Sequence, residues 1–279
     1  MQKSESPAQA ISISVVVYHS DLHVLMQTLK SLYVALRRTF QEGLIKQASV
    51  QIICNDDSAN HLRDALQSLA SADDIALSIL SAPVNIGYGA AHNVAITAAK
   101  TTFHLVLNPD VILAPDALQA GLAFLTANPE VSAASPLVTD GKGGRQYLCK
   151  RYPRVMDLVL RGFLPNMARK HFQQRLAYYE MQDLSEQQPA KNIPIISGCF
   201  MLFRTRPLQK LEGFNPRYFL YFEDFDLSLR ASVAGNLAFV PAMQIVHLGG
   251  HSGRKGWRHI SLFVRSGIRF YSTWGWRLW

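Results

Sequence analysis

The chain carries two short acidic stretches whose residue types and spacing could do chemistry. In the first, Asp110 follows an apolar run from Phe103 to Leu107, which has the pattern of a strand covered on both faces. Pro109 cannot donate to a sheet ladder and disfavours helical geometry in the residue before it, so the strand should end there. We therefore expect Asp110 to project from the carboxyl end of a central strand, where open α/β sheets bind ligands. The alternative is a turn residue or a helix cap.

The second stretch is the adjacent acid pair Glu223–Asp224, at the start of a predicted helix over 223–234. Acids suit a helix N-terminus because its N–H groups carry partial positive charge, and this alone could account for the pair. Apolar surroundings and a neighbouring carboxylate raise a carboxyl pKa, as a general base requires. The pair has such an aromatic setting, formed by Tyr218, Phe219, Tyr221, Phe222 and Phe225.

Two further polar clusters follow predicted strands. Residues 55–58, Asn-Asp-Asp-Ser, come directly after a strand at 50–54 and could either contact a ligand or close an Asx turn. Residues 85–93 form a loop whose glycines allow close backbone approach and which leads into a helix, an arrangement that favours phosphate. The loop resembles a dinucleotide fingerprint, but His92 occupies its third glycine position. A helix entry that needs glycine only for its geometry is the structural alternative.

Alternating strands and helices would position these clusters. In the first half we predict helices at about 22–40, 61–70, 93–100 and 116–127, between strands at 11–18, 50–54, 75–80, 103–107 and 131–136. Such alternation predicts an α/β fold with a mainly parallel, Rossmann-like sheet and helices on both faces. After Thr139 a basic and aromatic segment shows no clear period. A strand at 193–203, the helix at 223–234 and a short extended segment at 238–240 follow.

The chain has 279 residues and a formal net charge of +8, which is unevenly distributed. Residues 142–175 hold nine Lys or Arg and one acid, whereas residues 254–279 hold six and none. Such asymmetry favours a polyanionic partner: nucleic acid, nucleotide-sugar phosphates or an anionic membrane. The three cysteines show no CxxC spacing and predict neither a zinc site nor a disulfide framework. We expect no signal peptide and no membrane span, since the apolar run at 11–18 is too short.

Residues 254–279 are rich in arginine and tryptophan and form a predicted amphipathic tail. Arg258, Arg265 and Arg269 lie off its apolar helical stripe, which is Ile260, Phe263, Val264, Gly267, Ile268 and Tyr271. This is the composition of a helix that lies in a membrane interface. A helix packed on the body of the domain has the same pattern, so both interpretations stay open.

The chain resembles the inverting, GT-A-type glycosyltransferases of family 2, and among them the bacterial rhamnosyltransferase-like branch that builds surface polysaccharides. The resemblance spans about residues 11–252 and rests on five motifs in a fixed order, at 55–58, 85–93, 108–110, 222–230 and 246–252. It implies a GT-A domain over 1–253, with a nucleotide-binding half at about 11–138 and an acceptor-binding half at about 139–253. The tail, 254–279, would be a basic and aromatic addition and a candidate for membrane association.

The resemblance also implies a nucleotide-sugar site in the first half. Asn55 stands where the family has an Asp that binds the pyrimidine base, with Asp56 next to it, and either could make this contact. Three residues would lie beside the nucleotide-sugar: Asn85, Gly87 and Asn93.

The family's Asp-x-Asp metal motif is present in a variant form, in which Asn108 replaces the first acid and is a binding candidate. The resemblance implies that Asp110, the last acid, and His247 hold Mg²⁺ or Mn²⁺ together with the phosphates of the sugar donor. His247 could equally be a structural histidine. Asp224 would be the general base that activates the acceptor hydroxyl, with Glu223 beside it.

The expected function is transfer of a sugar with inversion, from dTDP-rhamnose or a similar donor onto a lipid-linked glycan in lipopolysaccharide or O-antigen biosynthesis. The protein would act in the cytoplasm, peripherally at the inner face of the cell membrane, with no nucleic-acid partner. Two other classes stay open on the residues alone. An NAD-binding oxidoreductase would use the glycine loop at 85–93, and a non-catalytic module would bind a polyanion or glycan through the basic segments.

Overall fold

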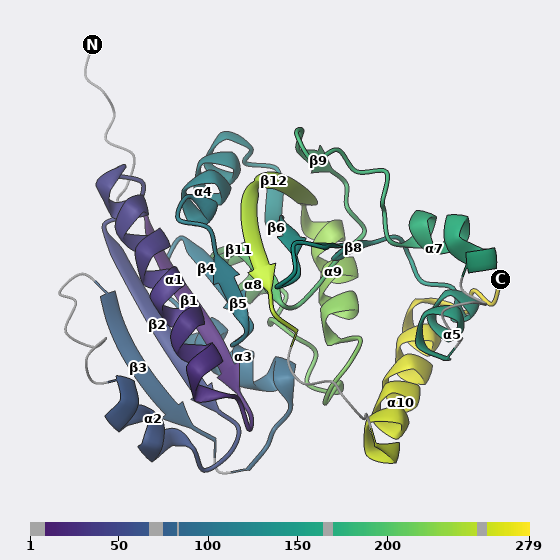
Figure 1. Cartoon of the computed structure of the whole chain (residues 1–279), viewed down its shortest axis with the longest axis horizontal. Coiled ribbons are helices and arrows are strands. Elements are labelled where there is room, and N and C mark those ends of the chain that lie inside the picture. Colours follow the sequence, from purple (N-terminus) through teal and green to yellow (C-terminus); the bar gives the residue numbers. More distant parts are fainter. Residues whose placement is uncertain (1–8, 67–74, 83, 164–169, 250–255) are drawn as a thin grey trace.

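The structure is a computed structural model that describes residues 9–66, 75–82, 84–163, 170–249 and 256–279. A large mixed sheet forms its centre, with helices on both faces (Figure 1). The predicted α/β class and the alternation of strands and helices in the first half are confirmed.

The first half of the sheet is parallel. Its strands lie in the order β3-β2-β1-β4, and all neighbours in this run are parallel. These strands are β1 (Ala10–Val17), β2 (Gln47–Cys54), β3 (Ile75–Ser81) and β4 (Phe103–Leu107). The helices that connect them are α1 (Leu22–Gln41), α2 (Ala59–Leu66) and α3 (Tyr88–Ala98). Because parallel strands end at one edge, the loops after β1, β2 and β4 come together there.

The second half of the sheet is mixed and continues the first without a break. β11 (Phe200–Arg204) is antiparallel to both β4 and β6 (Val131–Thr139). β12 (Asn236–His247) then pairs in parallel with β6 and antiparallel with the short β5 (Val111–Leu113). The two halves expected from the sequence therefore share one sheet, and their separate roles stay a prediction.

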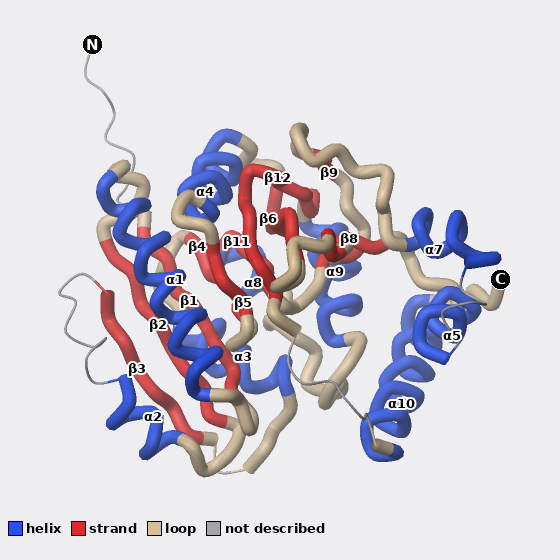
Figure 2. Tube along the Cα trace, viewed as in Figure 1, coloured by secondary structure: helices blue, strands red, loops and turns tan. Residues whose placement is uncertain are grey.

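Helices cover both faces of the sheet (Figure 2), and alternate residues of its strands belong to the apolar cores on the two sides. Ile13, Val15 and Ile52 belong to the core under α1, α2 and α4 (Ala117–Ala127). Val16 and Ile53 face α3 on the other side, where α8 (Thr205–Lys210) and α9 (Glu223–Ala234) also pack. Strands buried on both faces explain the continuous apolar runs of the sequence.

Four parts of the fold differ from the expectation. α3 begins at Tyr88, inside the loop predicted over 85–93. The strand predicted over 193–203 is divided into β10 (Ile195–Ile196), which pairs with β8 (Cys149–Lys150) in a separate small sheet, and β11 in the main sheet. β12 covers twelve residues, not only 238–240. Pro241 lies where the register of β12 against β6 shifts, between Val240 and Gln244, because proline cannot donate to a regular ladder. The segment after Thr139, which showed no period, contains short elements: β7 (Arg145–Gln146), β8 (Cys149–Lys150), α5 (Val155–Phe163), η1 (Lys170–Phe172), α7 (Gln173–Tyr179), β9 (Ala190–Lys191) and β10 (Ile195–Ile196).

The tail forms α10 (Trp257–Trp274), which lies beside α5 and apart from the sheet (Figure 1). Its buried face packs Phe270 and Tyr271 against Phe222, in the loop that leads into α9. The Trp274 indole N–H also donates to Asp226 of α9 over 3.0 Å. Packing of the tail on the domain is thus confirmed. Among the described residues, no helix combines the length and apolar character needed to span a bilayer.

Candidate active site

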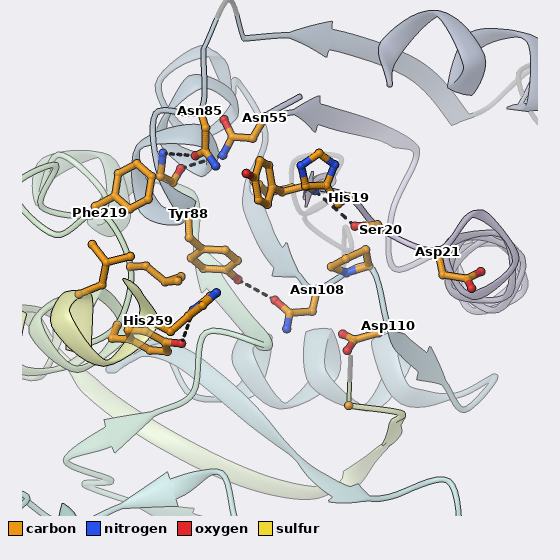
Figure 3. Close-up of a pocket in the computed structure, with 18 of the residues that line it drawn as sticks. His19, Ser20, Asp21, Asn55, Asn85, Tyr88, Asn108, Asp110, Phe219 and His259 are labelled. Carbon is orange, nitrogen blue, oxygen red and sulfur yellow. Dashed lines mark hydrogen bonds between the residues drawn. The ribbon is translucent and has the colours of Figure 1, made fainter. Parts of the chain in front are cut away.

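A cavity of about 970 Å³ opens at the edge of the sheet where the parallel strands end. The loops after β1, β2 and β4 line one side, and the segment before α9 and the first turn of α10 line the other. In Figure 3, Asn55 and Asn85 lie at one end, Asp110 and His259 lie farther along, and Tyr88 lies between them. The cavity therefore collects side chains from both ends of the sequence.

Asn55 and Asp56 have different positions relative to this cavity. Asn55 is buried and lines the cavity, and its amide N–H donates to the Gly87 carbonyl over 3.1 Å. The Asp56 carboxylate instead accepts from the backbone N–H of His19 and from Ser58, and Asp56 is not a lining residue. Of the two candidates for the contact with a base, Asn55 is the one at the cavity.

The loop before α3 is shaped by contacts within the chain. Asn85 Oδ1 accepts from the Gly87 N–H over 2.9 Å, and both residues line the cavity. Gly87 has a φ of +90°, and a Cβ there would lie 2.5 Å from the Phe219 carbonyl oxygen. Tyr88 N–H donates to that same oxygen over 3.0 Å. Glycine is therefore required at 87 because the loop meets the Phe219 backbone, and not only for approach of a ligand.

Asn93 does not occupy the expected position beside a ligand. Its amide donates to the Phe214 carbonyl over 2.7 Å and accepts from the Phe214 N–H over 2.8 Å, and it is not a lining residue of the cavity. The sequence-based interpretation of Asn93 as a binding residue is thus replaced by a structural one, in which it fixes α3 to the segment after α8.

Asp110 and His247 lie together at the cavity end of the sheet. Pairing of His247 with Val111, and a hydrogen bond from Leu248 N–H to the Asp110 carbonyl, bring the two side chains to 3.4 Å between His247 Nε2 and Asp110 Oδ1. Gln146 donates its amide N–H to the His247 carbonyl over 3.1 Å, and its Oε1 lies 3.0 Å from His247 Nδ1. This contact selects the tautomer of the neutral imidazole in which Nδ1 carries the proton and Nε2 has a lone pair.

This arrangement fits a divalent cation. A carboxylate oxygen and a neutral imidazole held by a second hydrogen-bond partner are suitable ligands, and substrate phosphates commonly complete such a shell. Within the described part of the chain, no group of three His, Cys, Asp or Glu residues forms a closed cage. His251, in the same sequence motif, lies outside the described residues.

The acid pair starts α9 after an unusual corner. Tyr221 and Phe222 both have positive φ values, +70° and +64°, which are costly for residues with a Cβ and occur where surrounding structure enforces them. Asp224 Oδ2 accepts from the Gly198 N–H over 2.9 Å. Glu223 is buried, and its Oε2 has no hydrogen-bond partner among the described residues.

Burial dominates the electrostatics of this pair. It raises the pKa of Glu223 to about 8, with a further contribution from the neighbouring Asp224 charge. Burial also raises the pKa of Asp224, while N–H groups of Gly198 and Phe225 oppose the shift because they stabilise the carboxylate. At neutral pH, therefore, Glu223 is the protonated acid and Asp224 the better candidate for the charged one.

Hydrogen bonds through Gly198 and Tyr88 connect the acid pair to the cavity. Neither acid is a lining residue, but the Tyr88 hydroxyl, which lines the cavity, donates to the Gly198 carbonyl over 2.6 Å. The N–H of the same residue, Gly198, holds Asp224. The structure thus brings all predicted site residues except Asp56 and Asn93 to the cavity or to the residues that border it.

Sequence reasoning missed three contributors to the cavity. Tyr18–Asp21 follow β1, and the rule that ligands bind beyond the carboxyl ends of parallel strands could have identified them. Tyr88 belongs to the motif at 85–93, in which the glycines and not the tyrosine indicated a ligand. Arg258 and His259 come from α10, and His259 Nδ1 lies 3.0 Å from the Tyr221 hydroxyl. No local pattern connects these tail residues to the sheet edge.

The fold is that of the GT-A glycosyltransferases. The structure is similar to the crystal structure of GalNAc-T7 with UDP, GalNAc and Mn²⁺, with a TM-score of 0.68 and 15% identity over 97% of this chain and 49% of that one. At this identity the similarity shows the fold alone. The chain belongs to glycosyl transferase family 2, whose model matches residues 12–212.

Two relatives are rhamnosyltransferases. Rhamnosyltransferase WbbL of Escherichia coli (strain K12) is 27% identical over 177 residues, which are 60% of this chain and 63% of that protein. The N-acetylglucosaminyl-diphospho-decaprenol L-rhamnosyltransferase of Mycobacterium tuberculosis (strain CDC 1551 / Oshkosh) is 29% identical over 222 residues, 71% of this chain and 69% of that protein. The match thus spans just under two thirds of the first relative's length.

Proposed function

We propose that the protein transfers a sugar, with inversion, from a nucleoside diphosphate donor to a lipid-linked glycan in cell-surface polysaccharide biosynthesis, and that the donor is dTDP-rhamnose. The observation that carries this proposal is that one cavity of a family 2 fold has a candidate cation site and a candidate general base next to it. Asp110 lines one part of it, and His247 Nε2 lies 3.4 Å from the Asp110 carboxylate, so the two side chains would form a cation site there. The acid pair 223–224 borders it through Gly198 and Tyr88.

Asp110 and His247 would hold Mg²⁺ or Mn²⁺. When bound, such a cation supplies positive charge that stabilises the leaving diphosphate. The GalNAc-T7 structure contains UDP and Mn²⁺, which supports a divalent cation in this fold. Asn55, Asn85 and Asn108 line the same cavity. Asn55 and Asn85 would contact the nucleotide part of the donor, and Asn108 would contact the donor beside the cation.

Asp224 would act as the general base. As the acceptor hydroxyl oxygen forms its bond to the anomeric carbon, Asp224 takes the hydroxyl proton and the bond to the donor diphosphate breaks, which inverts the carbon. The hydrogen bonds from Gly198 and Phe225 favour the ionised form of Asp224 against the effect of burial, and they orient the carboxylate for this step. Glu223, with its raised pKa, would remain protonated beside it and prevent a second buried charge.

The two relatives support rhamnose and a lipid-linked acceptor, since both are rhamnosyltransferases and one is named for N-acetylglucosaminyl-diphospho-decaprenol. The tail supports a site at a membrane surface. The exposed face of α10 carries Trp257, Val264 and Ile268 next to Arg265, while Arg258 in its first turn lines the cavity. We propose that this face rests on the inner surface of the cell membrane, so that a lipid diphosphate reaches the cavity past Arg258.

The dinucleotide-binding alternative has little support in the glycine loop. Both glycines face the protein's own chain, since a Cβ at Gly87 would meet Phe219 and one at Gly89 would meet Phe214 at 2.7 Å. The polyanion-binding alternative is weakened by ion pairing in the basic segment, which includes Arg145–Glu186, Lys150–Glu180, Arg151–Asp183, Arg161–Glu180 and Arg175–Asp157.

A donor and acceptor screen tests the proposed function. The full-length protein would be incubated with dTDP-, UDP- and GDP-sugars, with Mg²⁺ or Mn²⁺, and with a synthetic lipid diphosphate that carries N-acetylglucosamine. We expect transfer from dTDP-rhamnose in the presence of either cation. Transfer from a UDP- or GDP-sugar but not from dTDP-rhamnose would refute the donor assignment. Absence of transfer from every donor would refute the function.

A further inference from the structure

Tyr88 takes part in a hydrogen-bond arrangement that the proposed mechanism does not use. Its hydroxyl oxygen lies 2.6 Å from the Gly198 carbonyl oxygen and 3.0 Å from Asn108 Oδ1. Its ring packs edge-on against His92, with 4.5 Å between the centroids, and against Phe214. The hydroxyl therefore has a fixed position between two oxygen atoms.

A phenol has only one proton, so the hydroxyl cannot donate to both oxygens. Burial raises the pKa of Tyr88 well above its usual value, and nearby acids add to this, so the proton is retained. An oxygen–oxygen distance of 2.6 Å requires a proton between the atoms, and a backbone carbonyl can only accept. The Tyr88 proton is thus committed to Gly198.

The Tyr88 hydroxyl oxygen then has only lone pairs to offer Asn108, so the Asn108 atom 3.0 Å away must be a donor. The oxygen and nitrogen of an amide have nearly the same shape, so a half-turn of the amide exchanges them without moving their neighbours. The Asn108 backbone does not take part, since its N–H is held by the Cys199 carbonyl at 2.9 Å. Since Tyr88 has no second proton to donate, the favoured orientation of the Asn108 amide is the one with Nδ2 towards the Tyr88 hydroxyl.

We propose that Tyr88 is a positioning residue whose hydroxyl turns the Asn108 amide, so that the carbonyl oxygen of Asn108 faces the cavity beside Asp110. The atom of Asn108 remote from Tyr88 has no hydrogen-bond partner among the described residues and points away from the Tyr88 ring (Figure 3). After the half-turn, the atom at this position is the neutral carbonyl oxygen of Asn108, which can serve as a ligand to a hard cation. Because Tyr88 donates its proton to Gly198, the residue at position 108 must donate a hydrogen bond to the Tyr88 oxygen. An asparagine amide can do so, whereas the carboxylate that the family has at this position cannot.

This inference rests on the proposed function in one respect, namely that the cavity takes a divalent cation. The first test is therefore independent of both cation and sugar. In protein labelled with ¹⁵N at asparagine, we expect a strong nuclear Overhauser effect from the side-chain NH₂ of Asn108 to the ring protons of Tyr88. Its signal is assigned by its loss in Asn108→Asp. An NH₂ group that exchanges freely with solvent and shows no such effect would overturn the proposal.

The second test is a double-mutant cycle on Mn²⁺ binding, measured by electron paramagnetic resonance with dTDP present. Tyr88→Phe keeps the ring and should weaken Mn²⁺ binding about 10-fold, as loss of a group that orients a ligand typically does. Asn108→Asp offers an oxygen in either orientation, so in that background Tyr88→Phe should change binding less than about 2-fold. Tyr178→Phe, at an exposed tyrosine of α7, serves as control and should change nothing.

The outcomes separate the two claims. An equal effect of Tyr88→Phe in both backgrounds would show that the hydroxyl acts through Gly198 or general packing, and would overturn the role of the amide. If wild-type protein binds no Mn²⁺ while the Overhauser effect is present, the cation site of the proposed function fails and the orientation of Asn108 stands.

Discussion

At the residue scale, Asp110 and His247 are the most direct test of the cation site. Asp110→Asn keeps the shape of the side chain and its place between β4 and β5, but removes one charged ligand. We expect loss of divalent-ion dependence and a fall in transfer that corresponds to several kcal/mol of transition-state stabilisation. Isothermal titration with Mn²⁺ in the presence of dTDP measures the loss of binding directly.

A matched control is available six residues later. Asp116 is exposed, and its side chain makes no capping hydrogen bond to α4, so Asp116→Asn should leave Mn²⁺ binding and transfer unchanged. Normal turnover of Asp110→Asn at limiting Mn²⁺ would mean that Asp110 is only a turn residue.

At this scale, the sequence predicts correctly the position of a residue that directly follows a strand. Asp110 was predicted from the apolar run and the proline before it, and the structure puts it at the cavity. Asn93 and Asp56 lie in the same motifs, yet their side chains bind backbone groups of Phe214 and His19. A motif does not distinguish these cases, because the partner backbone comes from a distant part of the chain.

At the scale of elements, the two faces of α10 have different roles. Its buried face supports the strained corner before α9, where Phe222 contacts Phe263, Phe270 and Tyr271. The resemblance implied that the tail, 254–279, is an addition to the catalytic domain. The packing makes it part of that domain, because a truncation before Trp257 would expose Phe222 and remove one wall of the cavity.

The outer face of α10 can be tested without touching this packing. Val264 and Ile268 are both about half exposed, at 48% and 52%. The double variant Val264→Asp/Ile268→Asp should release the protein from vesicles that contain anionic lipid, because it removes apolar contact and adds repulsion. Vesicle co-sedimentation measures the release, and hydrolysis of the sugar donor should stay within about 2-fold of wild type.

Val233→Asp is the control for this experiment, since Val233 is 85% exposed but lies on α9. We expect it to bind vesicles as the wild type does. If the α10 double variant still co-sediments with vesicles, the outer face of the helix is not the membrane contact.

The parallel strands and their helices could be predicted because each carries its own pattern: apolar runs of strand length and apolar stripes of helical period. α5 and α7 could not, since they are short and packed within a segment whose charges pair with each other, such as Arg175 with Asp157. The contact of α10 with Phe222 joins residues far apart in the chain. No periodicity in either segment encodes it.

At the scale of the whole molecule, a buried polar chain crosses from the sheet to α3. Ser12 Oγ lies 2.8 Å from His104 Nδ1, Ser14 Oγ lies 2.9 Å from His104 Nε2, and Ser14 Oγ lies 2.7 Å from His92 Nδ1. Burial lowers the pKa of His104 to about 3 and lowers that of His92 well below its usual value. Both histidines are therefore neutral in the folded protein at pH 7.

These two histidines predict acid sensitivity. A histidine whose folded pKa is lower than its unfolded value contributes stability that is present above the unfolded pKa and lost as the pH falls below it. We expect the free energy of unfolding to drop by about 1.4 kcal/mol per pH unit for each histidine below about pH 6.5, and for His104 down to about pH 3. Urea unfolding at pH 7, 6 and 5 measures this slope.

His92→Gln should remove about half of this slope, while His61→Gln, at an exposed position of α2, should leave it unchanged. A stability that does not change between pH 7 and pH 5 in wild-type protein would show that the buried histidines are not held neutral.

The central claim is that Asp224 activates the acceptor in an inverting transfer, and the most direct measurement is the transfer rate of Asp224→Asn at saturating donor and cation. We predict a fall of roughly 10²- to 10⁴-fold, the usual contribution of a positioned base, with donor binding unchanged. Glu223→Gln should lose less, because Glu223 is already protonated at neutral pH. A near-normal rate for Asp224→Asn would contradict the mechanism, and loss of transfer in Glu223→Gln instead would assign the base to the other acid.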